Sequence, residues 1–123
     1  HGHLVGDAVL KEVVLLLQSR LRDTDTLSRF GGEEFVINLR MTSGADALIL
    51  AERLRTLVEE HAFSSLPEGE HLTISIGVAE CRAGDDIDRW LGRADSACYE
   101  AKSTGRNRVV LFHNQTPEKT ARQ

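Results

Sequence analysis

Apolar and polar residues recur along this chain with two different periods, and each period predicts one type of element. Spacings of three and four residues predict three helices. The first covers residues 7–21, and the second begins after Thr42 or Ser43, either of which can cap a helix. The third begins after 84–86 and ends near Gly105. Their apolar positions are Val9, Leu10, Val13, Val14, Leu17 and Leu21; Ala47, Leu50, Ala51, Leu54, Leu57 and Val58; and Ile87, Leu91, Ala94, Cys98 and Ala101.

Alternation with period two predicts the strands. Two strands near 26–30 and 35–41 flank a Gly-Gly pair, which is a strong hairpin signal. A third strand is expected over 72–78, and a short terminal strand over 109–112. The order helix, strand, strand, helix, strand, helix, strand indicates an α+β sandwich, with helices packed on a sheet that contains antiparallel strands.

Composition narrows the class of protein. A length of 123 residues fits one domain with its own core, and 41% hydrophobic with 28% charged residues is typical of globular proteins. A net charge of -4 argues against a nucleic-acid surface. There is no apolar run of the roughly 20 residues that span a bilayer. Cys81 and Cys98 lie in apolar-periodic segments, so we expect buried free thiols.

Candidate chemistry concentrates in the segment Arg29-Phe30-Gly31-Gly32-Glu33-Glu34-Phe35. A glycine turn leaves backbone N–H groups open to an oxyanion, and carboxylates at its exit can hold a hard cation. This combination suits a nucleoside triphosphate with magnesium. The alternative is an ordinary solvated hairpin with two surface acids.

The same segment resembles the signature of the GGDEF domain family, the diguanylate cyclases, in its Gly-Gly-Glu-Glu-Phe variant. Segments 1–7, 73–79 and 94–107 match further family motifs in the right order. The resemblance implies a GGDEF domain over 1–112 with a palm-like, ferredoxin-like α+β sheet flanked by helices, and a polar tail over 113–123.

The family fold opens with one more strand and helix, which this chain lacks. They carry an Asp that ligates metal and an Asn that reads guanine. We therefore expect these 123 residues alone to bind GTP weakly and to turn over negligibly. We also expect a gap in the sheet, unless another segment fills it, because vacant ladder groups are costly.

The resemblance implies an enzyme that condenses two GTP molecules into cyclic di-GMP and pyrophosphate with Mg²⁺ or Mn²⁺. It makes Glu33 a metal ligand and the base for the attacking hydroxyl. Glu34 is a second acid with a weaker claim to the metal. Gly31 and Gly32 would let the backbone approach the phosphates, and Arg29 would lie near them.

Three more residues match substrate contacts of the family. Asp7 corresponds to a guanine contact, and Lys102 and Arg106 to triphosphate contacts. Each has a simpler interpretation. Asp7 can cap a helix after Gly6, and basic residues near a helix C-terminus complement its dipole.

Arg22 and Asp25 match the family's Arg-x-x-Asp inhibitory site for cyclic di-GMP, and Arg53 matches a further arginine of that site. Arginine offers a fork of donors to phosphate or guanine, and the acid accepts from guanine. Alternatively, Arg22 ends a helix and Asp25 is a turn residue.

The sequence therefore predicts a diguanylate cyclase domain with product inhibition. A catalytically impaired cyclic di-GMP-binding module and a ligand-free dimerisation module are the alternatives. The family further implies a homodimer, an N-terminal sensory or regulatory domain in the parent protein, and a cytoplasmic location, with a parent that can be membrane-anchored.

Overall fold

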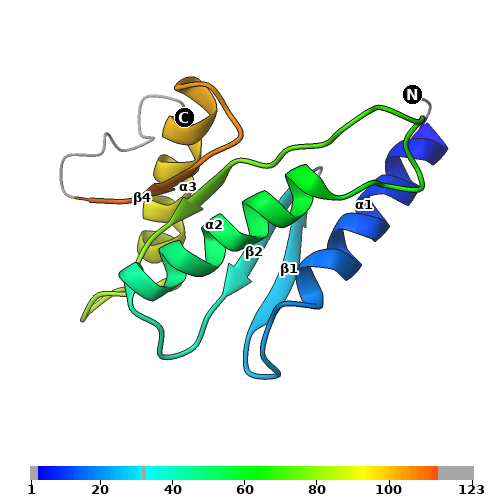
Figure 1. Cartoon of the computed structure of the whole chain (residues 1–123). Coiled ribbons are helices and arrows are strands. Elements are labelled where there is room, and N and C mark those ends of the chain that lie inside the picture. The colour runs from blue at the N-terminus through cyan, green and yellow to red at the C-terminus, as the bar shows by residue number, and fades with distance from the viewer. Residues whose placement is uncertain (1–2, 32, 114–123) are drawn as a thin grey trace. The chain divides into compact units, whose positions relative to one another are not determined.

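The structure, a computed structural model, describes residues 3–31 and 33–113 (Figure 1). Its elements are α1 (His3–Gln18), β1 (Thr26–Gly31), β2 (Glu34–Asn38), α2 (Gly44–Glu60), β3 (Ile76–Val78), α3 (Ile87–Ser103) and β4 (Val109–Leu111). The order of helices and strands is the predicted one. The described residues form two compact units, one up to residue 41 with 57–72, the other 42–56 with residues from 73 onward.

In the first unit, α1 buries one apolar stripe. Val9, Val13 and Leu17 recur every fourth residue and are buried, as are Val58 and Phe63. The helix begins at His3 rather than at residue 7 and ends at Gln18. The predicted helix boundaries were therefore wrong at both ends, although the apolar face was right.

The β1–β2 hairpin is antiparallel, with Leu27 opposite Ile37 and Arg29 opposite Phe35. The register shifts between Arg29 and Gly31, so the strand has an irregularity next to the turn. β2 ends at Asn38, earlier than the predicted residue 41.

In the second unit, β3 and β4 pair in parallel, with Ile76 opposite Val109, and both contact α3 (Figure 1). Gly77 lies against the helix, where a Cβ would collide with the carbonyl oxygen of Ala94 and the backbone of Cys98. This approach therefore requires glycine. The buried apolar residues of this unit are Ala51, Leu54, Val78, Ala97 and Ala101.

Capping side chains fix where α2 and α3 begin. Ser43 Oγ accepts from Asp46 N at 3.1 Å, and Asp86 Oδ1 accepts from Arg89 N at 2.8 Å. α3 ends at Ser103, just before Gly105, whose φ is +134°. These local signals were correctly interpreted from the sequence.

The predicted strand 72–78 forms only at its last three residues, because only these find a partner strand among the described residues. The described residues form two two-stranded sheets, β1 with β2 in the first unit and β3 with β4 in the second. The prediction that both cysteines are buried was wrong. Cys81 lies in the loop after β3 and is exposed, while Cys98 is partly buried; neither is in a disulfide.

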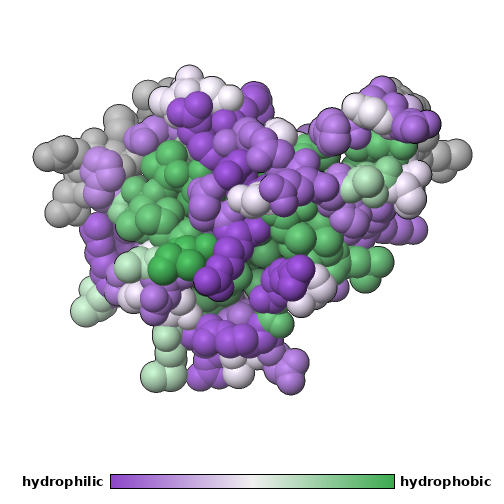
Figure 2. Space-filling view, in the orientation of Figure 1, coloured by the Kyte–Doolittle hydropathy of each residue, from purple (hydrophilic) through white to green (hydrophobic). Residues whose placement is uncertain are grey.

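Apolar residues also reach the surface, where green areas interrupt the purple ones in Figure 2. Among the described residues, the most exposed large apolar one is Met41, at 98%, and Ile87 is 63% exposed although it was predicted on an apolar face. It lies in the first turn of α3, directly after the cap. No described helix is both long and apolar enough to cross a membrane.

Candidate functional site

The hairpin turn presents open backbone and carboxylates. Gly31 has a φ of +111°, and among the described residues no atom lies within 4 Å of where its Cβ would stand. Glycine is therefore required here by conformation and not by crowding. Gly32 lies outside the described residues.

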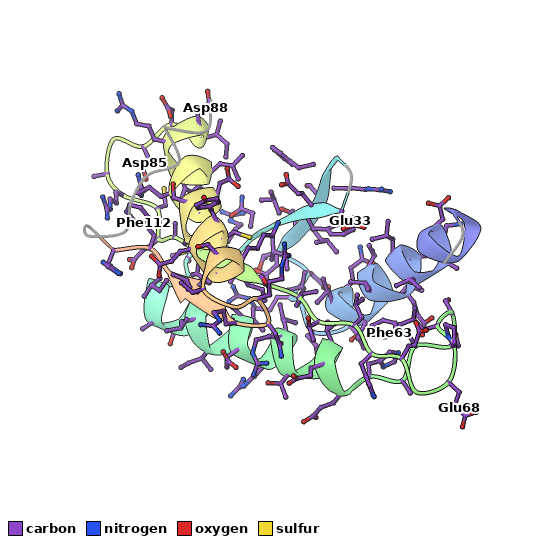
Figure 3. All side chains as sticks on the ribbon, turned by 90° about the horizontal axis from the view of Figure 1, so that it is seen from above. Glu33, Phe63, Glu68, Asp85, Asp88 and Phe112 are labelled. Atoms are coloured by element: carbon purple, nitrogen blue, oxygen red, sulfur yellow. The ribbon has the colours of Figure 1, made fainter. Side chains whose placement is uncertain are left out.

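Glu33 lies in the turn at the tip of the hairpin (Figure 3), and Glu34 opens β2 opposite Gly31. Both residues are exposed. Their hard oxygen atoms fit a magnesium ion by chemistry. Within the described part of the chain no group of three or more His, Cys, Asp and Glu residues forms a complete metal site. These two acids could thus supply only part of a coordination shell.

Arg29 and Asp7 also belong to the first unit. Arg29 is exposed on β1, directly opposite Phe35. Asp7 is exposed within α1, four residues after the helix begins at His3. The interpretation of Asp7 as a helix cap was therefore wrong, because a cap precedes the first turn.

Lys102 lies near the C-terminal end of α3, and Arg106 lies in the turn that follows the helix. Both are exposed and belong to the second unit. Lys102 is in the last helical turn, where it also complements the dipole. Arg106 lies three residues after Ser103, where α3 ends, with a φ of +61°, and its backbone N donates to Ala101 O at 2.9 Å. These two cations belong to the second unit, and the hairpin belongs to the first.

The structure brings Arg22 and Asp25 together. Arg22 Nε donates to Asp25 Oδ2 at 3.2 Å, Arg22 Nη2 donates to Asp25 Oδ1 at 3.0 Å, and the Arg22 backbone N donates to Oδ2 at 2.9 Å. These bonds from Arg22 lower the pKa of Asp25, and Asp25 in turn raises the pKa of Arg22. Arg53 is exposed on α2 and belongs to the second unit.

A cluster around Glu12 was missed by sequence reasoning. Its carboxylate accepts from Ser64 N at 3.0 Å, Ser64 Oγ at 3.0 Å, Ser65 N at 3.2 Å and Ser65 Oγ at 2.9 Å, and lies 3.2 Å from His61 Nε2. The backbone bond from Ser64, with the other hydrogen bonds, lowers the pKa of Glu12 to about 2. Glu12 thus fastens the loop after α2 to α1. No sequence signal pointed to it, because the partners are about fifty residues away along the chain.

Comparison with known proteins identifies the family. The family described as "Diguanylate cyclase, GGDEF domain" matches residues 1–108. The chain therefore belongs to the GGDEF domain family, and its fold is the α+β fold of such domains.

Two relatives and two solved structures illustrate the similarity. The chain is 42% identical to Diguanylate cyclase A of Treponema denticola and 47% identical to the response regulator PleD of Caulobacter vibrioides, covering 96% and 89% of this chain. It spans only 32% and 25% of those proteins. The structure of the active GGEEF domain of a diguanylate cyclase from Vibrio cholerae matches with a TM-score of 0.86 at 39% identity, over 93% of this chain and 72% of that one.

The GGDEF domain of DgcB from Caulobacter crescentus, solved in complex with c-di-GMP, matches with a TM-score of 0.81 at 29% identity, over 89% of this chain and 66% of that one.

Proposed function

We propose that this chain is the catalytic domain of a diguanylate cyclase, which joins two GTP molecules into cyclic di-GMP. The observation that carries the proposal is the hairpin turn, where Gly31 has a positive φ and open surroundings and Glu33 is exposed at the tip. The similarity to proteins named diguanylate cyclases supports it.

The chemistry requires a 3′-hydroxyl to attack an α-phosphorus while pyrophosphate leaves. When bound, Mg²⁺ or Mn²⁺ neutralises phosphate charge and activates the attacking oxygen. Glu33, with Glu34 beside it, would hold the metal, and Glu33 would accept the hydroxyl proton as the new P–O bond forms. The step occurs twice per product, so two pyrophosphates leave for each cyclic di-GMP.

Other residues of the chain would bind and orient the nucleotide. The backbone N–H groups of Gly31 and Gly32 would approach the phosphates, with Arg29 nearby. Asp7 can accept hydrogen bonds from the adjacent guanine donors. Lys102 and Arg106 would hold the triphosphate.

Product inhibition is the finer part of the proposal. Arg22 is 59% exposed at its side chain and is already oriented by Asp25, so its remaining surface is accessible to a phosphate or guanine. Arg53 would add a further cation. The same pair supports the second candidate function, a regulatory module that binds cyclic di-GMP without turning over GTP. The presence of both acids of the signature favours the enzyme.

The chain spans 32% and 25% of the two relatives named above, so activity is tested in the full-length protein. GTP consumption with magnesium is compared for wild type, Glu33→Gln and the control Glu68→Gln, which changes an exposed loop glutamate. Glutamine keeps the shape but removes the charge and the base, so we expect Glu33→Gln to lower turnover roughly 100- to 10,000-fold. Turnover close to wild type in Glu33→Gln would reject the assignment.

A further inference from the structure

The turn that follows α3 has an unusual backbone. Gly105, Arg106 and Asn107 have φ angles of +134°, +61° and +47° in succession. Glycine adopts such angles freely, whereas residues with a Cβ do so at a cost, although asparagine tolerates them better than most. Arg106 must therefore be kept in this conformation by its surroundings.

The backbone on both sides of Arg106 is fixed by hydrogen bonds. Arg106 N donates to Ala101 O at 2.9 Å, and Asn107 N donates to Ser75 Oγ at 3.2 Å. The next residue connects directly to the strands, because Ile76 N donates to Arg108 O at 3.0 Å. The turn is thus bonded to the last turn of α3 and to the segment around β3.

A side chain from α2 completes the support. Arg55 Nη1 donates to Asn107 Oδ1 at 2.9 Å, across 52 positions of sequence. The opposite side of the guanidinium is fixed on its own helix, where Arg55 Nε donates to Glu52 Oε1 at 2.7 Å. A guanidinium has only donors, so it defines which amide atom of Asn107 faces it.

Arg55 itself is poorly placed to meet a ligand. Its side chain is only 17% exposed, and its guanidinium is bonded to Glu52, Thr56 and Asn107. Arg106, one residue before Asn107, is exposed. A hydrogen bond to Asn107 therefore affects the direction in which the side chain of Arg106 leaves the backbone.

We propose that Arg55 and Asn107 are positioning residues, which hold the turn after α3 so that Arg106 faces the polyphosphate of a nucleotide. The inference rests on the proposed function, in which Lys102 and Arg106 bind the triphosphate. It adds that Arg55 on α2, which does not touch the substrate, determines how strongly Arg106 binds the triphosphate. Pre-organised cations lose less conformational freedom on binding.

Affinity for two ligands separates positioning from general damage. Calorimetry on the full-length protein with magnesium compares GMP with a GTP analogue that carries a methylene in place of the α,β-bridging oxygen. Loss of Arg55 should weaken binding of the triphosphate analogue about tenfold and leave GMP affinity unchanged. The control Arg89→Ala removes an exposed arginine of α3 and should change neither affinity.

Three variants complete the test. Asn107→Gly removes the acceptor but permits the same φ, so it should reproduce the selective loss of Arg55→Ala even if that variant does not fold. Arg106→Ala should also weaken binding of the triphosphate analogue while leaving GMP affinity unchanged. Because Arg55 acts through Arg106, the double variant Arg55→Ala/Arg106→Ala should bind the analogue no more weakly than Arg106→Ala alone.

The outcomes distinguish the two proposals. If Arg106→Ala lowers the affinity for the analogue but Arg55→Ala and Asn107→Gly do not, the positioning role is wrong and the triphosphate contact stands. An equal loss of GMP and analogue affinity in Asn107→Gly would also reject positioning, because it would indicate a purely structural role. If wild type does not prefer the analogue over GMP, or Arg106→Ala has no effect, the proposed triphosphate contact fails together with the inference.

Discussion

Asp25 holds the guanidinium of Arg22 by two of its nitrogens and also accepts the backbone N–H of the same residue. The Asp25 side chain is 1% exposed, while that of Arg22 is 59% exposed. Arg22 Nη2 additionally donates to Arg40 O at 3.1 Å. The acid is thus the buried anchor of the pair, and the arginine is the part that a ligand can reach.

Arg22→Ala should relieve product inhibition while leaving GTP turnover intact, because Arg22 lies on a different motif from the acids. Affinity for cyclic di-GMP, measured by calorimetry on the full-length protein, should fall at least about tenfold, as for loss of a charged hydrogen-bonding group. Arg20→Ala, a nearby exposed arginine, is the control. Unchanged affinity in Arg22→Ala would mean that the pair only closes a turn.

Glu12→Gln should lower the stability of the fold at neutral pH and make that stability less dependent on pH in the acid range. The folded-state pKa of Glu12 is lowered from 4.5 to about 2, so its contribution is fully present above about pH 4.5 and is lost as the pH falls toward 2. Glutamine has no such proton to gain. Urea midpoints of wild type should therefore fall more steeply across this interval than those of the variant.

The control for that experiment is Glu68→Gln, a loop glutamate that is exposed. It should follow the wild-type curve. A Glu12→Gln curve parallel to that of wild type between pH 4.5 and 2 would show that the cluster with Ser64 and Ser65 does not hold the carboxylate in its charged form.

Gly77→Ala and Gly92→Ala should change stability in opposite directions. A methyl group at Gly77 would collide with the backbone of α3, which should cost about 1–3 kcal/mol or more. Gly92 lies in the middle of α3, and no described atom stands within 4 Å of its added Cβ, so alanine should stabilise the helix by up to about 1 kcal/mol. Denaturant unfolding of both variants checks this, and equal shifts would contradict the close approach of β3 to α3.

The proposed reaction needs two GTP-loaded domains that face each other. Activity of the full-length protein should therefore rise more steeply than linearly with enzyme concentration near the dimer dissociation constant. Activity and oligomeric state are measured over the same dilution series. Strict proportionality down to a monomeric regime would contradict the dimer.

Local signals in the sequence predicted much of the fold. The cap at Ser43, the helix start at 84–86, the hairpin at Gly31 and the stop near Gly105 depend on a few neighbouring residues, so they were readable. The length of β3 was not, because strand formation depends on a partner distant in sequence. Exposure of Cys81 was missed for a similar reason, since periodicity does not show where a strand gives way to a loop.

The candidate site shows the same division. The motifs placed Glu33 in a turn and Lys102 near a helix end, as found, whereas Arg22 lies in the loop after α1 and does not end the helix. The contacts of Glu12 with Ser64, and of Arg55 with Asn107, join segments far apart in the chain. Such tertiary contacts leave no periodic trace, so only the structure reveals them.

The identity of the product tests the central proposal most directly. Purified full-length protein is incubated with GTP and magnesium, and nucleotides and pyrophosphate are quantified by chromatography and a coupled assay. We predict one cyclic di-GMP and two pyrophosphates for every two GTP consumed. Failure to consume GTP, or its conversion to GDP and inorganic phosphate without cyclic di-GMP, would contradict the assignment of this domain as a diguanylate cyclase.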